Sequence, residues 1–200
     1  MKILAFTDVH RTDQKTIKKA LLGIVKKAQQ ADIMICCGDI SLFGRGFKQA
    51  LNILMKANKP LLIIHGNHEE ERSVSHLQLK NIIPFHRKPH RIGNYLFLGH
   101  GGGGFSMVDR KLEQRLPQFK EKIQPGDKII LVTHGPPFNT ELDYLPLYGS
   151  VGCRSITKAI KELKPHLFLC GHLHENFTVH QKLGQTFMLN PGPLGTLIEL

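Results

Sequence analysis

No stretch of this sequence offers the roughly 18 continuous apolar residues that a membrane-spanning helix requires. The N-terminal segment has one Lys and a short apolar run that Asp8 and His10 interrupt, so it lacks the apolar region and cleavage site of a secretory signal. No Cys-x-x-Cys pair occurs, and three of the four cysteines lie in or beside apolar runs, which favours reduced, buried thiols. We therefore expect a cytoplasmic protein without a membrane partner.

The sequence also lacks a Pro-, Gly- or Ser-rich linker, an internal repeat and a low-complexity tract. Its 200 residues are 41% apolar, which is enough for one domain with a substantial core. These properties predict a single domain over residues 1–200.

Acidic residues are few, with 16 Asp and Glu against 27 Lys and Arg and a net charge of +11. Such a balance can attract anionic substrates or nucleic acid. Much of the charge, however, lies on a predicted helix whose apolar residues recur with helical spacing, so its lysines belong to a solvent-facing side. The segment 80–91 is a second basic region, and solvation is the favoured interpretation there too. Nucleic acid is therefore an allowed partner that the charge alone does not favour.

Short apolar runs rich in β-forming residues alternate with amphipathic stretches along the chain. We expect strands at 2–6, 32–37, 60–64, 95–98, 128–132 and 167–170. We expect helices at 12–29, 47–56, 109–122 (with a kink or break at Pro117) and 155–163, and helical residues after Glu69. Two or three further strands should follow in residues 177–200. This order predicts a layered α/β domain in which antiparallel pairing is added late.

Five of the predicted strands are each followed by side chains that can bind a metal ion. The five segments are Asp8-Val9-His10, Gly38-Asp39, Gly66-Asn67-His68-Glu69, Thr133-His134-Gly135 and Gly171-His172-Leu173-His174. Ligands of layered α/β folds bind at the carboxyl ends of strands, so all five segments can converge. Each motif alone is weak, because a single His near a strand end is more often an ordinary polar residue. Five in this arrangement indicate a site.

The donor set of these segments indicates the chemistry of that site. Carboxylate and amide oxygens with imidazole nitrogens, and no thiolate, suit manganese, iron or zinc. One carboxylate can bridge two ions that lie about 3.5–4 Å apart. Two such ions lower the pKa of a shared water and clamp the attacking and leaving oxygens of phosphoryl transfer. The residues therefore predict a phosphoesterase with two divalent metal ions, manganese being favoured.

The order of these motifs resembles the calcineurin-like metallophosphoesterase superfamily, in particular its small, single-domain, phosphodiesterase-like members. The resemblance extends from residue 3 to about residue 193 and includes the turn at Asn190-Pro191-Gly192. It implies a four-layer αββα sandwich, in which two mixed β-sheets are flanked by helices. It also implies seven metal ligands: Asp8, His10 and His174 for one ion, Asn67, His134 and His172 for the other, and Asp39 as the bridge.

The resemblance gives His68 a separate role. It would not bind metal, but would stabilise the phosphoryl oxygens and protonate the leaving alkoxide, as a general acid does. Glu69 stands where the superfamily more often has Asp, and one hypothesis is that this acid orients His68. The remaining histidines are expected to be surface or packing residues: His65, His76, His86, His90, His166 and His180. For His100 and the glycines 101–104, approach to the substrate phosphate and a flexible connector are the alternatives.

We expect hydrolysis of a small phosphodiester, with a cyclic nucleotide as one candidate, through attack of a metal-bridging hydroxide on phosphorus. A phosphomonoesterase or a nuclease could use the same residues. A non-catalytic protein-interaction scaffold of the same fold is the alternative from another class, although its members usually lack ligands that are present here. The segment 135–154, with Tyr144 and Arg154, is expected to form a wall of the substrate cleft or an ordinary surface loop. The oligomeric state stays open.

Overall fold

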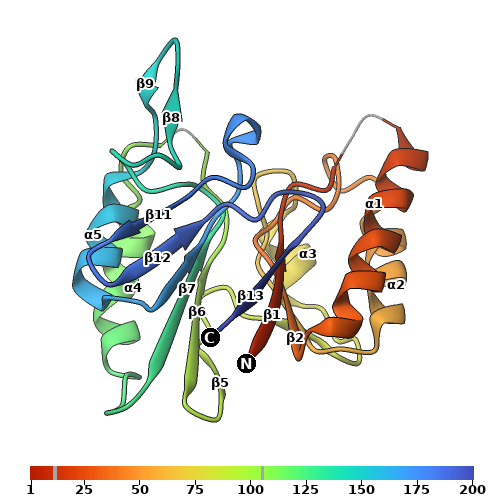
Figure 1. The fold of residues 1–200 in the computed structure, drawn as a ribbon, viewed down its shortest axis with the longest axis horizontal. Helices are drawn as coiled ribbons and strands as arrows, with labels where there is room; N and C mark the ends of the chain where they lie inside the picture. Colours follow the sequence, from red (N-terminus) through yellow and green to blue (C-terminus); the bar gives the residue numbers. More distant parts are fainter. Residues whose placement is uncertain (11–12, 105) are drawn as a thin grey trace.

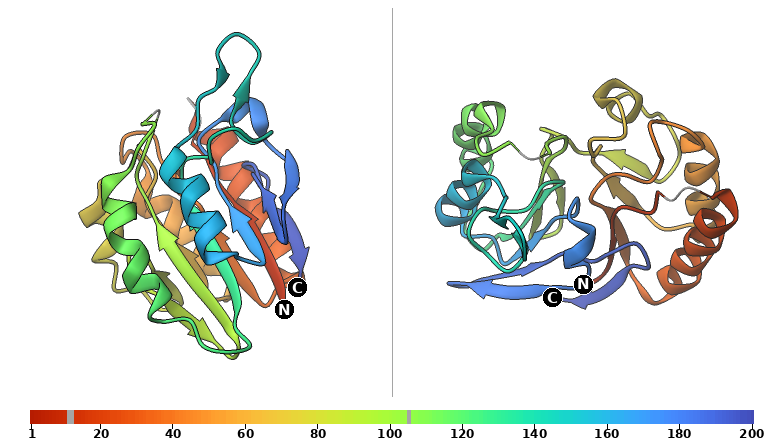
Figure 2. Two further views of the ribbon diagram at one scale, coloured as in Figure 1. Left: turned by 90° about the vertical axis from the view of Figure 1, so that its left-hand side faces the viewer. Right: turned by 90° about the horizontal axis from the view of Figure 1, so that it is seen from above.

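The structure, a computed structural model, describes residues 1–10, 13–104 and 106–200. Two large mixed β-sheets face each other, and helices cover the outer face of each sheet (Figure 1; Figure 2). This is the predicted αββα sandwich. The start of the predicted helix at Thr12 lies outside the described residues.

The first sheet has five strands, and only its edge strand β13 is antiparallel to its neighbour. In spatial order the strands are β13 (Thr196–Glu199), β1 (Lys2–Phe6), β2 (Ile33–Cys36), β3 (Leu61–Ile63) and β4 (Ile82–Pro84). The late antiparallel pairing that the sequence indicated is therefore present, because the last strand returns to lie beside the first.

The second sheet has six strands, with antiparallel pairs at both edges and a parallel centre. Its strands are β11 (His180–Leu183), β12 (Thr186–Leu189), β10 (Leu167–Leu169), β7 (Lys128–Thr133), β6 (Tyr95–His100) and β5 (His90–Ile92). A small hairpin, β8 (Tyr144–Leu145) and β9 (Gly149–Ser150), projects from the domain (Figure 1).

The central strands are apolar on both faces, because one face packs in the core between the sheets and the other packs against the outer helices. In β1, Ile3 and Ala5 pack into the core between the sheets, whereas Leu4 and Phe6 pack against the helices on the outer face. Successive side chains of a strand point to opposite faces, so a strand buried on both faces needs a continuous apolar run. The same alternation in β7 sends Ile130 and Val132 inward.

The helices run close to the predicted bounds. They are α1 (Gln14–Lys27), α2 (Phe47–Leu54), α3 (Glu71–Ser75), α4 (Arg110–Lys120) and α5 (Arg154–Leu163), and three short 3-10 turns are Ala28–Gln30, Met55–Ala57 and His174–Asn176. Asp109 caps α4 as predicted, because its side chain accepts a hydrogen bond from the Leu112 N–H at 2.9 Å. Pro117 lies inside α4 without ending it. The core packing of Leu116 and Phe119 extends across that position.

The strands β4, β5, β8 and β9 were not predicted, because they are too short to show an apolar pattern and are defined only by their pairing with other strands. Strand β6 also runs two residues past its predicted end, because Gly99 and His100 pair with Val132 and Thr133. All four cysteines are free and buried, as predicted. In the part of the chain that the structure describes, no helix combines the length and the apolarity needed to cross a lipid bilayer.

Candidate metal centre

The five predicted ligand segments meet at one edge of the domain. Strands β1, β2 and β3 of one sheet and β7 and β10 of the other end there, at the upper edge in Figure 1. Backbone hydrogen bonds join the segments, with the Asp8 N–H donating to the Gly38 carbonyl at 3.1 Å and the Gly171 N–H to the His134 carbonyl at 2.8 Å. The convergence expected from the strand ends is therefore present.

Asp8, His10 and His174 form the first group that could hold a metal ion, with ligand atoms within 4.8 Å of one another. One carboxylate oxygen of Asp8, Oδ2, accepts hydrogen bonds from the Thr7 hydroxyl at 2.6 Å and the His172 N–H at 2.9 Å. The other, Oδ1, is buried and has no hydrogen-bond partner among the described residues. It lies 3.5 Å from His174 Nε2 and 3.7 Å from His10 Nε2. A buried oxygen aimed between two imidazoles fits a cation.

The second group is centred on Asn67. Its Oδ1 lies 2.9 Å from both His134 Nε2 and His172 Nδ1, and His134 Nε2 lies 3.1 Å from Asp39 Oδ2. His134 Nδ1 donates to the Cys37 carbonyl at 2.9 Å, so a neutral His134 ring turns a lone pair toward these oxygens. Either a proton on Nε2 or a metal ion between these atoms would hold them together, so the arrangement is a second observation that fits a metal ion.

Asp39 lies between the two groups. Its Oδ2 is 3.1 Å from His134 Nε2 and 3.9 Å from His10 Nε2, while Oδ1 accepts a hydrogen bond from the His68 backbone N–H at 2.9 Å. One carboxylate oxygen thus faces ligands of both groups. This is the position that a bridging ligand would occupy.

The charges of this site shift the pKa values of its members strongly. Burial alone would raise the pKa of Asp8, but the neighbouring imidazoles of His10 and His174 outweigh it and hold the pKa well below its usual range. Burial alone would lower the pKa of His134, but the bond to Asp39 and the charges of Asp8 and Asp39 raise it to about 9. A proton on His134 therefore competes with a metal ion for the same electron pairs.

His68 lies at the edge of this group with 17% of its side chain exposed. Its Nε2 is 4.0 Å from Asp39 Oδ2, and its ring centroid is 4.5 Å from that of His10. Proximity alone would also allow His68 to bind a metal ion together with His10 and Asp39. Its distinct role as a general acid stays a prediction.

Glu69 joins two ligand loops, and none of its described hydrogen bonds goes to His68. Its carboxylate accepts from the Asp39 N–H (2.9 Å), the Ser41 N–H (2.9 Å), the Ser41 hydroxyl (2.8 Å) and the Gly66 N–H (3.2 Å). Burial and the charge of Asp39 raise the pKa of this carboxyl to about 7. The described contacts replace the hypothesis that Glu69 orients His68, since they tie the loop after β2 to the loop after β3.

Three of the predicted ligands have a left-handed backbone. The φ angles of Asp8, Asp39 and His172 are +51°, +56° and +70°, each directly after or near a strand end. Such angles are uncommon outside glycine and concentrate at functional sites. Gly171 allows a close approach of two chain segments, because a Cβ there would lie 2.0 Å from the Thr7 hydroxyl and 2.4 Å from Asp8 Oδ2.

A second histidine cluster lies nearby, formed by His65, His86 and Glu71, with ligand atoms close enough for a metal ion. Its hydrogen bonds argue against one. The Gly101 N–H donates to His86 Nδ1 at 2.7 Å, so the neutral ring carries its proton on Nε2, which faces Glu71 at 3.5 Å. An Nε2–H cannot bind a metal. Burial also lowers the pKa of His65 to about 4 and that of His86 to about 2, which agrees with the predicted packing role.

His100 does not point at the metal centre. Its Nε2 lies 2.8 Å from Asp109 Oδ2, at the start of α4. Of the glycines that follow it, Gly101 and Gly102 pack against His65. This part of the glycine segment is therefore a packed connector.

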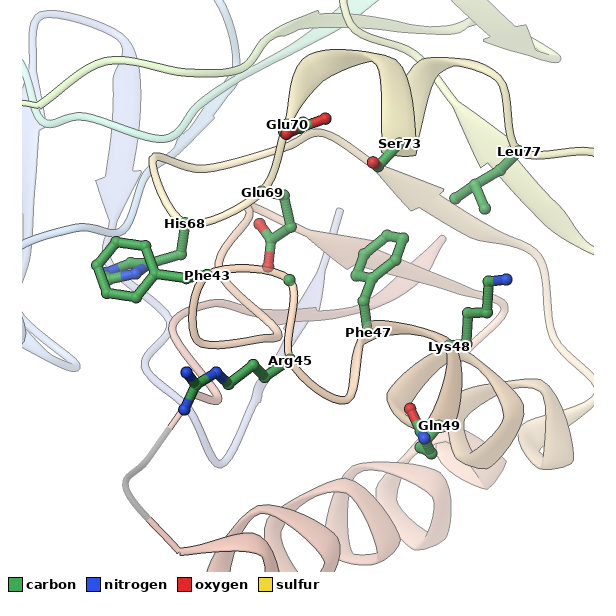
Figure 3. A pocket seen from close by; sticks show the side chains of 11 residues that line it. Phe43, Arg45, Phe47, Lys48, Gln49, His68, Glu69, Glu70, Ser73 and Leu77 are labelled. Atoms are coloured by element: carbon green, nitrogen blue, oxygen red, sulfur yellow. The ribbon is translucent and has the colours of Figure 1, made fainter.

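A cavity of about 660 Å³ opens beside His68 (Figure 3). It is lined by residues 43–45 and 47–49 and by His68, Glu69, Glu70, Ser73 and Leu77. Tyr144 and Arg154 line two other cavities that contain none of the predicted ligands. The segment 43–49 thus lines the cavity that also contains His68, and sequence reasoning missed it because it carries no metal-binding side chain.

Comparison with known proteins agrees with this geometry. An uncharacterized protein, MJ1162, of Methanocaldococcus jannaschii is 28% identical over 96% of this chain and 88% of its own length. The crystal structure of TT1561 from Thermus thermophilus has a TM-score of 0.74 at 20% identity, covering 96% of this chain and 89% of that one. A dimetal phosphatase from Danio rerio has a TM-score of 0.65 at 10% identity, covering 97% and 88%.

The likeness to these solved structures shows the fold, and the sequence shows the family. The model of the calcineurin-like phosphoesterase family matches residues 1–176, a span that contains all five segments of the metal centre. With both sheets, their order and the clustered Asp and His side chains in place, the chain belongs to the calcineurin-like phosphoesterase family.

Proposed function

We propose that this protein is a hydrolase of phosphoester bonds that depends on two divalent metal ions, and that its substrate is a small phosphodiester. The observation that carries the proposal is the convergence of carboxylate, amide and imidazole ligand atoms around two positions that share Asp39. Family membership supports the reaction class. The whole chain, residues 1–200, would act as one domain.

Seven side chains would hold the ions: Asp8, His10 and His174 the first, Asn67, His134 and His172 the second, and Asp39 both. Manganese is the favoured ion, and iron or zinc suits the same donors. When bound, two such ions supply an activated water and neutralise charge on the phosphoryl oxygens. The protein's own contribution is orientation: Cys37 fixes the His134 ring, and Glu69 holds the two loops that carry Asp39 and Asn67.

His68 would act on the substrate itself. Its backbone N–H is tied to Asp39 Oδ1, so the ring is held beside the shared carboxylate, at the mouth of the cavity in Figure 3. From there a protonated imidazole would contact a phosphoryl oxygen and give its proton to the leaving oxygen.

The test is hydrolysis of bis(p-nitrophenyl) phosphate by chelator-stripped protein titrated with Mn²⁺. We expect turnover that depends on the ion and that Asp39→Asn largely abolishes, whereas the same change at the exposed Asp32 leaves it intact. Folded protein without turnover in Mn²⁺, Fe²⁺ or Zn²⁺ would contradict the proposal and favour a scaffold. Faster turnover of p-nitrophenyl phosphate than of the diester would assign a monoesterase instead.

A further inference from the structure

The loop between β2 and α2 places an aromatic ring beside His68. The ring centroids of Phe43 and His68 lie 4.5 Å apart in an edge-on arrangement, and Figure 3 shows Phe43 in front of the imidazole at one end of the cavity. Phe43 is nevertheless 73% exposed. Burial of apolar surface in the core therefore does not explain why a large ring stands here.

The backbone beneath this ring has a conformation that aromatic residues seldom adopt. The Arg45 N–H donates to the Leu42 carbonyl at 3.0 Å and closes a turn whose central residues, Phe43 and Gly44, have φ angles of +49° and +75°. Positive φ at both central positions is the pattern of a type I′ turn, which favours Gly, Asn or Asp. Phe43 is thus both exposed and strained, and residues that keep such strain concentrate at binding and catalytic sites.

The rest of the cavity suits a flat group with a polar edge. Phe47 and Leu77 supply apolar surface, and Gln49 and Ser73 supply hydrogen-bonding groups. Arg45 is exposed, and its side chain points to the same side as His68 in Figure 3, toward the end where a phosphoryl group would lie. An aromatic ring next to a cation is the combination that binds planar rings attached to phosphates.

We propose that the cavity receives a planar aromatic ring carried by the phosphoester substrate, and that Phe43 selects for this ring by stacking on it. The inference rests on the proposed function, because it takes the metal centre as the place where the phosphoryl group binds. A nucleoside ester and a simple aryl ester share this chemistry. Phe43 is a specificity-determining residue in both cases.

The test uses three phosphonates, whose C–P bonds cannot be hydrolysed as esters: the phosphonate analogue of adenosine 5′-monophosphate, benzylphosphonate and ethylphosphonate. Their binding to Mn²⁺-loaded protein is measured by calorimetry. We expect the ring-bearing compounds to bind about ten- to a hundredfold more tightly than ethylphosphonate. Tighter binding of the adenosine compound than of benzylphosphonate would identify a nucleobase, and equal binding a plain aromatic ring.

Two variants at one position separate recognition from folding. Phe43→Tyr keeps the ring, so the preference should persist. Phe43→Gly relieves the positive φ, so its melting temperature should not fall, while the preference for a ring should disappear. Equal binding of all three compounds to the wild-type protein, or a preference that Phe43→Gly retains, would overturn the inference while leaving the metal centre intact. Failure of every phosphonate to bind would overturn the inference, whereas the proposed function is decided separately by the turnover of bis(p-nitrophenyl) phosphate.

Discussion

Replacing Glu69 by Gln preserves the shape of this side chain but changes one of its two hydrogen-bond acceptors into a donor. The carboxylate oxygens accept four hydrogen bonds, two each, from the loops after β2 and β3. In Gln the amide oxygen can keep one pair, while the NH₂ group faces the donors of the other pair. At least one buried backbone N–H loses its acceptor, at about 1–3 kcal/mol, and the retained bonds lose the strengthening that a charged acceptor provides. Removal of the charge offsets part of this loss, because the burial and the repulsion from Asp39 that raise the pKa of Glu69 to about 7 oppose folding at pH 8. We therefore expect Glu69→Gln to lower the free energy of unfolding by about 1–2 kcal/mol.

The assay is urea unfolding of the metal-free protein followed by circular dichroism, at pH 8, above the raised pKa of about 7. Ser41→Ala, which removes only the hydroxyl donor, should cost about 1 kcal/mol. The matched control is Glu70→Gln, the same change at the exposed neighbouring residue, which should remain within about 0.5 kcal/mol of the wild type. A Glu69→Gln variant as stable as this control would refute the role of Glu69 as the tie between the two loops.

Two further predictions concern the close packing at Gly171 and the ion pair at the start of α4. Gly171→Ala would push its Cβ into Thr7 and Asp8, so we expect Mn²⁺ affinity to fall about 10–100-fold. The control is Gly23→Ala on the exposed face of α1, where a Cβ meets nothing within 4 Å. This variant should gain about 0.5–1 kcal/mol of stability and keep its Mn²⁺ affinity. Similar affinities of the two variants in a Mn²⁺ titration would count against the close packing at Gly171. The hydrogen bond to His100 lowers the pKa of Asp109 to about 2, below its unfolded value of 3.8. This contribution to stability is present above about pH 4 and is lost as the pH falls toward 2. Asp109→Asn keeps a capping side chain, so it should lower the free energy of unfolding at pH 7 by only about 1 kcal/mol and make the melting temperature depend less on pH between about 4 and 2. An unchanged pH dependence of the melting temperature in that range would contradict the pairing.

Much of the fold followed from local patterns in the sequence. The apolar runs of β1, β2, β7 and β10 are long enough to be read directly, because a strand buried on both faces needs every residue apolar. The helices followed from their spacing, and α4 from its capping residue Asp109. The edge strands β4 and β5 and the hairpin β8–β9 did not follow. Their few residues have no periodicity of their own, and only pairing with distant segments makes them strands.

The residues of the candidate site were also named from the sequence, because a parallel strand directs the residues after it to one edge of its sheet. That reasoning used residue type and position, and both are local. It could not supply the acceptor role of Glu69, which one hypothesis placed against His68 and which instead binds the backbone of two loops. The bridging position of Asp39 came from the family resemblance, and the structure places one oxygen of Asp39 near ligands of both groups.

The sequence by itself determined the layered α/β fold, the five ligand-bearing strand ends and the family to which they belong. The tertiary structure decided what surrounds them: the tautomer that argues against a metal ion at His86, the packed glycines beneath His65, and the strained Phe43 beside His68. The physical reason is the range of the interactions. Hydrophobic periodicity and strand-end position act between neighbours in sequence, whereas the tautomer of a buried ring, and the environment of an exposed one, depend on segments that folding alone brings into contact.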